Sequence, residues 1–223
     1  MRPAVLWMFP LTILTMRIEK IEKSKHKQER ILVYLEGESP LRLTGDALLR
    51  FGLQAGMDLP EETVVQLREE EQRYMTRSRG AHIASSRMVS KKELKDRLQR
   101  RGADAETAEE TADWLEELGA VNDEAYAGAI ARHYGQMGYG KLRVQQELQR
   151  RGIGRDLWDG AIAQLPEPAE TIRLLLDRRT KGGQITAEEG RKLSAMLQRR
   201  GFSWREIRPV LQEYLSGAEL PED

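Results

Sequence analysis

Leu98-Gln99-Arg100-Arg101-Gly102 recurs as Leu148-Gln149-Arg150-Arg151-Gly152 and again as Leu197-Gln198-Arg199-Arg200-Gly201, at a spacing of roughly fifty residues. A period of this length is typical of tandem structural units. Each copy has an apolar residue four positions before its leucine (Leu94, Val144 and Leu193), so both side chains lie on one face of a helix. Each glycine occupies the position where a left-handed residue commonly ends a helix. The three copies predict three related helical units.

The two arginines of the motif have a purely structural explanation. Arginine in the last turn complements the negative end of the helix dipole, and glycine adopts the left-handed conformation without a Cβ clash. Three copies in register therefore indicate a shared unit and do not by themselves indicate what the unit binds.

The motif helices have recognisable starts and helical neighbours. Ser90-Lys91-Lys92-Glu93 and Thr186-Ala187-Glu188-Glu189 have the form of a capping box. An apolar periodic run follows each motif, and a third helical segment precedes it, over residues 61–88, 123–137 and 168–179. We expect a mainly α-helical protein with three tandem three-helix repeats, at residues 61–119, 120–166 and 167–216, that form an elongated, curved array. Gly80, which follows Arg79, is expected to weaken or break the first of these helices.

The N-terminal part has a different periodicity. Residues 28–35, the turn-forming Glu36-Gly37-Glu38, and the alternation of Leu41 and Leu43 around Arg42 predict a β-hairpin. Residues 17–27 supply a further strand with a basic face. We assign residues 16–58 to a small β-rich segment that precedes the helices. Residues 1–15 are expected to be a non-native or disordered extension, with Met16 as the initiator, and residues 217–223 a flexible tail.

Composition narrows the class of protein. About a third of the 223 residues are charged, the formal net charge is zero, and there is no cysteine. The absence of cysteine excludes disulfides and thiolate metal sites and agrees with a reducing compartment, so we expect a cytoplasmic protein. Residues 1–15 include an apolar stretch that is too short to span a bilayer, and we expect no membrane contact.

The sequence contains no complete catalytic motif among those considered. The stretch from Gly135 to Lys141 fits G-x-x-x-x-G-K, but Leu142 stands where a phosphate-binding loop needs serine or threonine, and the preceding residues predict a helix rather than a strand. The three histidines have no spacing that would build a metal site. We expect no enzymatic activity, no cofactor and no small-molecule substrate, and we interpret these glycines as ending one helix and starting the next.

Although the net charge is zero, basic and acidic residues are gathered in separate blocks along the chain. Between Arg73 and Arg101 there are ten Lys or Arg residues against two acids, and between Gly102 and Ala131 there are nine acids and no base. Such blocks can be solvated faces that pair with one another, or a basic stripe that meets phosphates or an acidic protein groove. Because aromatic residues such as Tyr139 are sparse in the basic segments, we expect any DNA contact to be weak and independent of base sequence.

Taken together, several stretches resemble the RecX family, regulators of the bacterial recombinase RecA. They are Ser90 to Gly102, Leu115 to Ala127, Gly138-Tyr139-Gly140 through Leu148 to Ile153, and Gly201-Phe202-Ser203. The opening residues 16–51 are similar to the N-terminal part of Gram-positive-type members. Each motif alone is weak, whereas their order and spacing are specific and cover nearly everything after Met16.

The resemblance implies a monomeric regulator that lies in the groove of the RecA–DNA filament. There it would inhibit ATP hydrolysis, filament extension and strand exchange, and so act in recombination, DNA repair and the SOS response. The residues expected to face filament walls or DNA phosphates are the basic ones of the repeats: Arg97, Arg100, Arg101, Lys141, Arg143, Arg150, Arg151, Arg199 and Arg200.

Two other functions stay open on the residues alone. A helical module that binds DNA directly would show steep salt dependence and would act without any recombinase. A structural adaptor for another protein would show neither DNA binding nor an effect on the filament.

Overall fold

The computed structural model describes residues 15–25 and 29–215, and it shows a mainly helical protein with a small N-terminal sheet, as predicted. Of the predicted extension at 1–15, residues 1–14 lie outside the described residues, as does the predicted tail at 217–223, whereas Thr15 is the first residue of a strand. The described chain divides into two compact units. The first holds the chain up to Gly80 together with residues 102–111, and the second holds residues 81–101 and everything from Ala112 onward.

The first unit is built on a four-stranded antiparallel sheet with strand order β3-β2-β1-β4. The strands are β1 (Thr15–Lys23), β2 (Arg30–Leu35), β3 (Leu41–Thr44) and β4 (Asp58–Pro60), and the short helix α1 (Gly45–Arg50) follows β3. The predicted hairpin is confirmed, with its turn at Gly37, whose φ is +74°. Strand β4 and helix α1 are additions that the alternation pattern did not predict.

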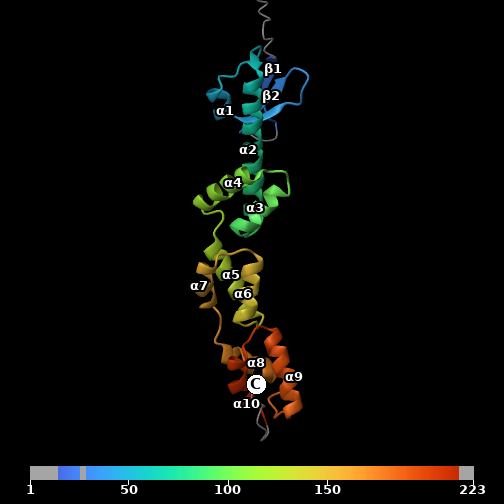
Figure 1. Cartoon of the computed structure of the whole chain (residues 1–223), viewed down its shortest axis with the longest axis vertical. Helices are drawn as coiled ribbons and strands as arrows, with labels where there is room; N and C mark the ends of the chain where they lie inside the picture. The colour runs from blue at the N-terminus through green and yellow to red at the C-terminus, as the bar shows by residue number, and fades with distance from the viewer. Residues whose placement is uncertain (1–14, 26–28, 216–223) are drawn as a thin grey trace, which may run out of the picture. The chain divides into compact units, whose positions relative to one another are not determined.

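Alternation explains which face of the sheet is buried. Val33 and Leu35 of β2 and Leu41 and Leu43 of β3 are buried, whereas Arg42 between them is exposed. Together with Leu67 of helix α2 (Glu61–Ser86), they form the core of this unit. Figure 1 shows α2 beside the sheet.

Helix α2 continues without interruption through Gly80, so the predicted break there is wrong. A single interior glycine costs about 1 kcal/mol relative to alanine. Gly80 is buried, and tertiary packing contributes more to helix stability than propensity does. The loss at one position is therefore too small to end a helix of 26 residues.

Three helices follow each other in each predicted repeat. After α2 come α3 (Lys91–Gln99) and α4 (Ala105–Glu117). The next set comprises α5 (Asp123–Gln136), α6 (Lys141–Arg150) and α7 (Trp158–Ile162), with the one-turn 3₁₀ helix η1 (Arg155–Leu157) before α7. The last set comprises α8 (Pro168–Thr180), α9 (Ala187–Arg199) and α10 (Trp204–Gln212), and Figure 1 shows both later sets as bundles.

The two later bundles have separate hydrophobic cores. In the α5–α7 bundle, Val144 and Leu148 of the motif helix are fully buried beside Ile130. In the α8–α10 bundle, Leu197 is buried with Ile172 and Ile207. The apolar positions of the motif helices thus form the cores that the sequence predicts.

The predicted helix starts and ends are confirmed. Both capping boxes are formed, with Ser90 and Thr186 accepting hydrogen bonds from the backbone N–H groups of Glu93 and Glu189. The motif glycines have positive φ, +91° at Gly102, +70° at Gly152 and +91° at Gly201. Glycine is the residue that adopts this left-handed conformation without a steric penalty.

Candidate functional site

Two joints connect successive motif helices in the second unit: the end of α6 meets the start of α3, and the end of α9 meets the start of α6. At the later of these joints, the backbone N–H of Gly140 donates to the Arg200 carbonyl at 2.9 Å and that of Leu142 to the Gly201 carbonyl at 3.0 Å. A Cβ added at Gly140 would lie 2.6 Å from the Gly201 oxygen. The approach of the two backbones therefore requires glycine at position 140.

This joint explains the G-x-x-x-x-G-K pattern. Gly135 lies beside the Pro166 side chain, and a Cβ added at Gly135 would be 2.9 Å from that side chain. Gly138, just after α5, has a φ of +75°. Gly140 then caps the start of α6. The glycines thus end one helix and start the next, as the sequence predicts, and Gly140 also allows a close contact that the sequence does not predict.

Arg200 is used within the joint. Its Nη1 donates to the carbonyls of Met137 at 2.9 Å and Gly138 at 3.2 Å. Its guanidinium also lies 5.3 Å from the centre of the Tyr139 ring, and that of Arg143 lies 6.0 Å from the same ring. Arg200 thus satisfies the carbonyls of the two residues that follow α5.

The earlier joint uses a side chain instead of a glycine backbone. The hydroxyl of Ser90, which is fully buried, donates to the Arg151 carbonyl at 2.6 Å. Gly152 packs against Lys92 so closely that a Cβ at Gly152 would need the lysine side chain to move. Ser90 therefore caps α3 and at the same time holds the end of the next motif.

Glu147 organises the arginines of the second motif. Its side chain is 6% exposed and accepts hydrogen bonds from Arg150 Nη2 at 2.6 Å and Arg151 Nε at 2.7 Å. Arg151 also donates to the Tyr126 hydroxyl and lies 5.3 Å from that ring. The hydrogen bond from Arg150 lowers the pKa of the Glu147 carboxyl, so the buried group is ionised at neutral pH.

The nine basic residues predicted to meet a partner thus fall into two groups. The Arg151 side chain is half-buried against Glu147 and Tyr126 of its own bundle. Arg200 is half-buried in the later joint, and Arg97 is half-buried on α3. Burial, followed by the nearby charges of Arg87 and Arg100, lowers the pKa of the Arg97 guanidinium. The remaining six are exposed: Arg100, Arg101, Lys141, Arg143, Arg150 and Arg199. Contact of any of the nine with a partner stays a prediction.

Ser90 supports the earlier joint, and Glu147 and Tyr126 hold Arg151, but none of the three was predicted as a member of a site. For Ser90 the capping-box pattern was visible, yet nothing local shows that its hydroxyl also reaches Arg151. Glu147 stands at the position that Arg97 and Met196 occupy in the other two copies of the motif, so the repeat gives no signal for it.

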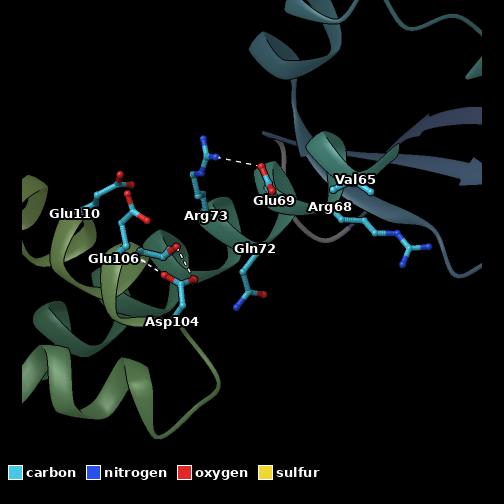
Figure 2. A pocket seen from close by; sticks show the side chains of 9 residues that line it. Val65, Arg68, Glu69, Gln72, Arg73, Asp104, Glu106 and Glu110 are labelled. Carbon is cyan, nitrogen blue, oxygen red and sulfur yellow. Dashed lines mark hydrogen bonds and ion pairs between the residues drawn. The ribbon is translucent and has the colours of Figure 1, made fainter. Parts of the chain in front are cut away.

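One pocket lies in the first unit, between α2 and the start of α4 (Figure 2). It has a volume of about 650 Å³, and its lining includes Arg68 and Arg73 together with four acids, Glu69, Asp104, Glu106 and Glu110. The Asp104 carboxylate is engaged in capping α4, because it accepts from the backbone N–H of Thr107 at 2.7 Å, and this hydrogen bond lowers the pKa of Asp104.

Among the described residues, no group of three or more His, Cys, Asp or Glu side chains could hold a metal ion. Within the same part of the chain, no helix is both long and apolar enough to cross a bilayer. Fold and joints together define a helical-repeat protein that carries exposed basic side chains at the repeated motif.

The comparisons with known proteins identify the family. Residues 122–162 match the family described as RecX, second three-helix domain. The regulatory protein RecX of Deinococcus radiodurans is 34% identical over 147 residues, which are 65% of this chain and 70% of that protein. The regulatory protein RecX of Clostridioides difficile is 24% identical over 204 residues, which are 89% of this chain and 96% of that protein. The chain belongs to the RecX family.

A solved structure of a regulatory protein RecX has a similar fold. Its TM-score is 0.71 at 25% sequence identity, and the match covers 89% of this chain and 99% of the other. RecX from Lactobacillus salivarius has the same fold over 65% of this chain, with a TM-score of 0.58. The likeness therefore extends beyond the one domain that the family description matches.

Proposed function

We propose that this protein binds the RecA–DNA filament in its groove and inhibits ATP hydrolysis, filament extension and strand exchange. It would thereby act in the cytoplasm as a monomeric regulator of recombination, DNA repair and the SOS response. Membership of the RecX family supports the choice of partner. The observation that carries the mechanism is that six basic side chains in the motif helices or just after them are exposed, while the Arg151 side chain is held by Glu147 and the Arg200 side chain is used within a joint.

Obstruction by many weak contacts is the mechanism that this arrangement favours. The exposed cations come from α6 and α9 or from the residues that end α3, so successive repeats can each place one to three charges against an acidic wall or a phosphate. Once one unit is bound, the others bind at a raised effective concentration, and contacts that are weak singly become tight together. Exposed charges are screened by salt, so binding should weaken as ionic strength rises.

The test is the DNA-dependent ATPase of the RecA from the same organism, titrated with the protein at fixed salt. We expect inhibition at levels below one protein per RecA. A triple variant, Arg101→Gln, Lys141→Gln and Arg199→Gln, should inhibit more weakly with unchanged helicity, because these exposed side chains have no ion pair within the described residues. Lys192→Gln is the matched control, since its 73% exposed side chain already pairs with Glu188.

A parallel titration of free single- and double-stranded DNA separates this function from direct DNA binding. Inhibition that follows capture of free DNA would point to the helical DNA-binding module instead. Inhibition by the triple variant equal to that by the unaltered protein would contradict the role of the exposed cations. No effect on RecA at all would contradict the proposal as a whole.

A further inference from the structure

A small basic pocket lies in the first unit, between α2 and the junction of β3 with α1. Its volume is about 220 Å³. Three arginines line it, Arg50 of α1 and Arg73 and Arg77 of α2, and Glu70 is the one carboxylate among its lining residues. Arg73 and Arg77 are four positions apart, so they lie on one face of the helix.

Glu70 draws two of these guanidinium groups together. Its Oε1 lies 2.7 Å from Arg50 Nη2 and 3.1 Å from Arg73 Nη1. Arg73 also lies 3.6 Å from Glu69. Each guanidinium has five N–H donors, so these contacts engage a minority of the donors of Arg50 and Arg73. The side chain of Arg50 stays 59% exposed and that of Arg73 stays 45% exposed, which leaves both accessible to a ligand.

Neutral groups complete the lining. The Thr44 hydroxyl accepts a hydrogen bond from the backbone N–H of Ala47 at 3.2 Å, so its own hydrogen is available to donate. Tyr74 adds a phenol, and the buried Leu43 and Ala47 add an apolar wall. An apolar wall lowers the local dielectric and strengthens charge-assisted hydrogen bonds.

We propose that this pocket binds a phosphate group, held by Arg50, Arg73 and Arg77 with the hydroxyls of Thr44 and Tyr74 as further donors. The forked guanidinium matches the geometry of two phosphate oxygens, and charge-assisted bonds of this kind are about twice as strong as neutral ones. The lining residues carry three positive charges against one negative charge, and Glu69, which pairs with Arg73 without lining the pocket, adds a second negative charge. The net charge around the pocket stays positive, and a terminal phosphate, with a charge of about −1.5 to −2 at neutral pH, complements it.

The site is independent of the proposed filament contacts. Every residue that lines it lies in the first unit, and none belongs to the repeated motif. The ligand class is a phosphorylated compound, whether a nucleotide or a nucleic-acid strand that presents its phosphates. The larger pocket of Figure 2 borders the same helix but has more acids than bases, so it does not favour an anion.

Calorimetric titration of the full chain with inorganic pyrophosphate, without RecA, tests the site. We expect saturable binding that Arg50→Gln and Arg77→Gln each weaken about tenfold or more, since a hydrogen bond to a charged group contributes about 1.5–3 kcal/mol. Arg77→Lys keeps the positive charge and loses the forked guanidinium, so this variant should bind pyrophosphate with intermediate affinity. Arg68→Gln is the matched control, because Arg68 is an exposed arginine of α2 that pairs with Glu38 and does not line the pocket.

A spectroscopic readout on the unaltered protein keeps the test valid if a variant fails to fold. Pyrophosphate should shift the arginine Nε–H resonances of Arg50, Arg73 and Arg77 and leave that of Arg68 in place. Lack of saturable binding, or equal weakening by Arg68→Gln and the pocket variants, would overturn the proposal.

Competition then identifies the source of the phosphate. A single-stranded oligonucleotide that displaces pyrophosphate only when it carries a 5′-phosphate identifies a strand end. Displacement with or without that group identifies backbone phosphates. If pyrophosphate binds and neither form of the oligonucleotide displaces it, the ligand is a free nucleotide or another small phosphate.

Discussion

Glu147 is the residue whose environment makes the clearest prediction. Its buried carboxylate accepts from Arg150 and Arg151, so Glu147→Gln replaces a charged acceptor by a neutral one while the arginines remain. We expect a loss of about 1–3 kcal/mol in the free energy of unfolding, the usual cost of losing hydrogen bonds to a charged group. Urea denaturation at neutral pH, monitored by far-UV circular dichroism, measures it.

The same carboxylate predicts a dependence on pH. Its pKa in the folded protein lies below the unfolded value, so its stabilising contribution is complete at neutral pH. That contribution is lost as the pH falls below about 4 to 5, through the unfolded and then the folded pKa. The loss of stability on acidification should therefore be smaller in Glu147→Gln than in the unaltered protein. Glu110→Gln, at an exposed position of α4, is the control, and an equal change in both variants would contradict the role of Glu147.

At the scale of one element, the cap of α3 is predicted to do more than start a helix. Ser90→Ala removes an N-cap, which costs about 1 kcal/mol, and also the bond to the Arg151 carbonyl. Thr186→Ala removes an N-cap of the same capping-box form, and that cap is exposed. Ser90→Ala should therefore lower the free energy of unfolding by about 1 kcal/mol more than Thr186→Ala, in parallel urea titrations. Equal losses would mean that the contact between the bundles contributes nothing.

The start of α6 makes a second prediction at this scale. Gly140 has φ of −89°, so alanine there meets no backbone strain, only the Gly201 oxygen and the Phe202 ring. Gly140→Ala should cost about 1–3 kcal/mol, as overpacking does. Gly160→Ala in α7 has open space and should be neutral or stabilise by up to about 1 kcal/mol. Thermal melts of the two variants check this, and a harmless Gly140→Ala would contradict the close backbone contact.

These two elements also show how far the sequence predicts the structure. The caps of α3 and α9 and the glycine ends of the motif were predicted because each is a local pattern within a few residues. The joints were not, because the contact of Gly140 with Gly201 depends on where two bundles lie and not on their own sequences. The sequence also could not separate Arg151 and Arg200, which are half-buried, from Arg150 and Arg199, which are exposed.

At the scale of the whole molecule, the two compact units have hydrophobic cores of their own, and this predicts unfolding in more than one step. The sheet unit has its core around Val33 and Leu67, and the α8–α10 bundle has another around Leu197. Chains built from such units often depart from two-state behaviour, because each can open separately. Leu67→Ala and Leu197→Ala each remove a fully buried side chain, at a cost of about 2–5 kcal/mol.

If the units open separately, each variant should weaken protection in its own unit only. Hydrogen exchange followed by mass spectrometry distinguishes them: Leu67→Ala should raise exchange in β2 and β3, and Leu197→Ala should raise it in α8–α10. A single transition in urea, shifted equally by both variants and with uniform loss of protection, would show instead that the chain unfolds as one cooperative body. Separate opening would mean that the phosphate pocket of the first unit and the motif cations of the bundles can be altered independently, because a change that destabilises one unit would leave the other folded.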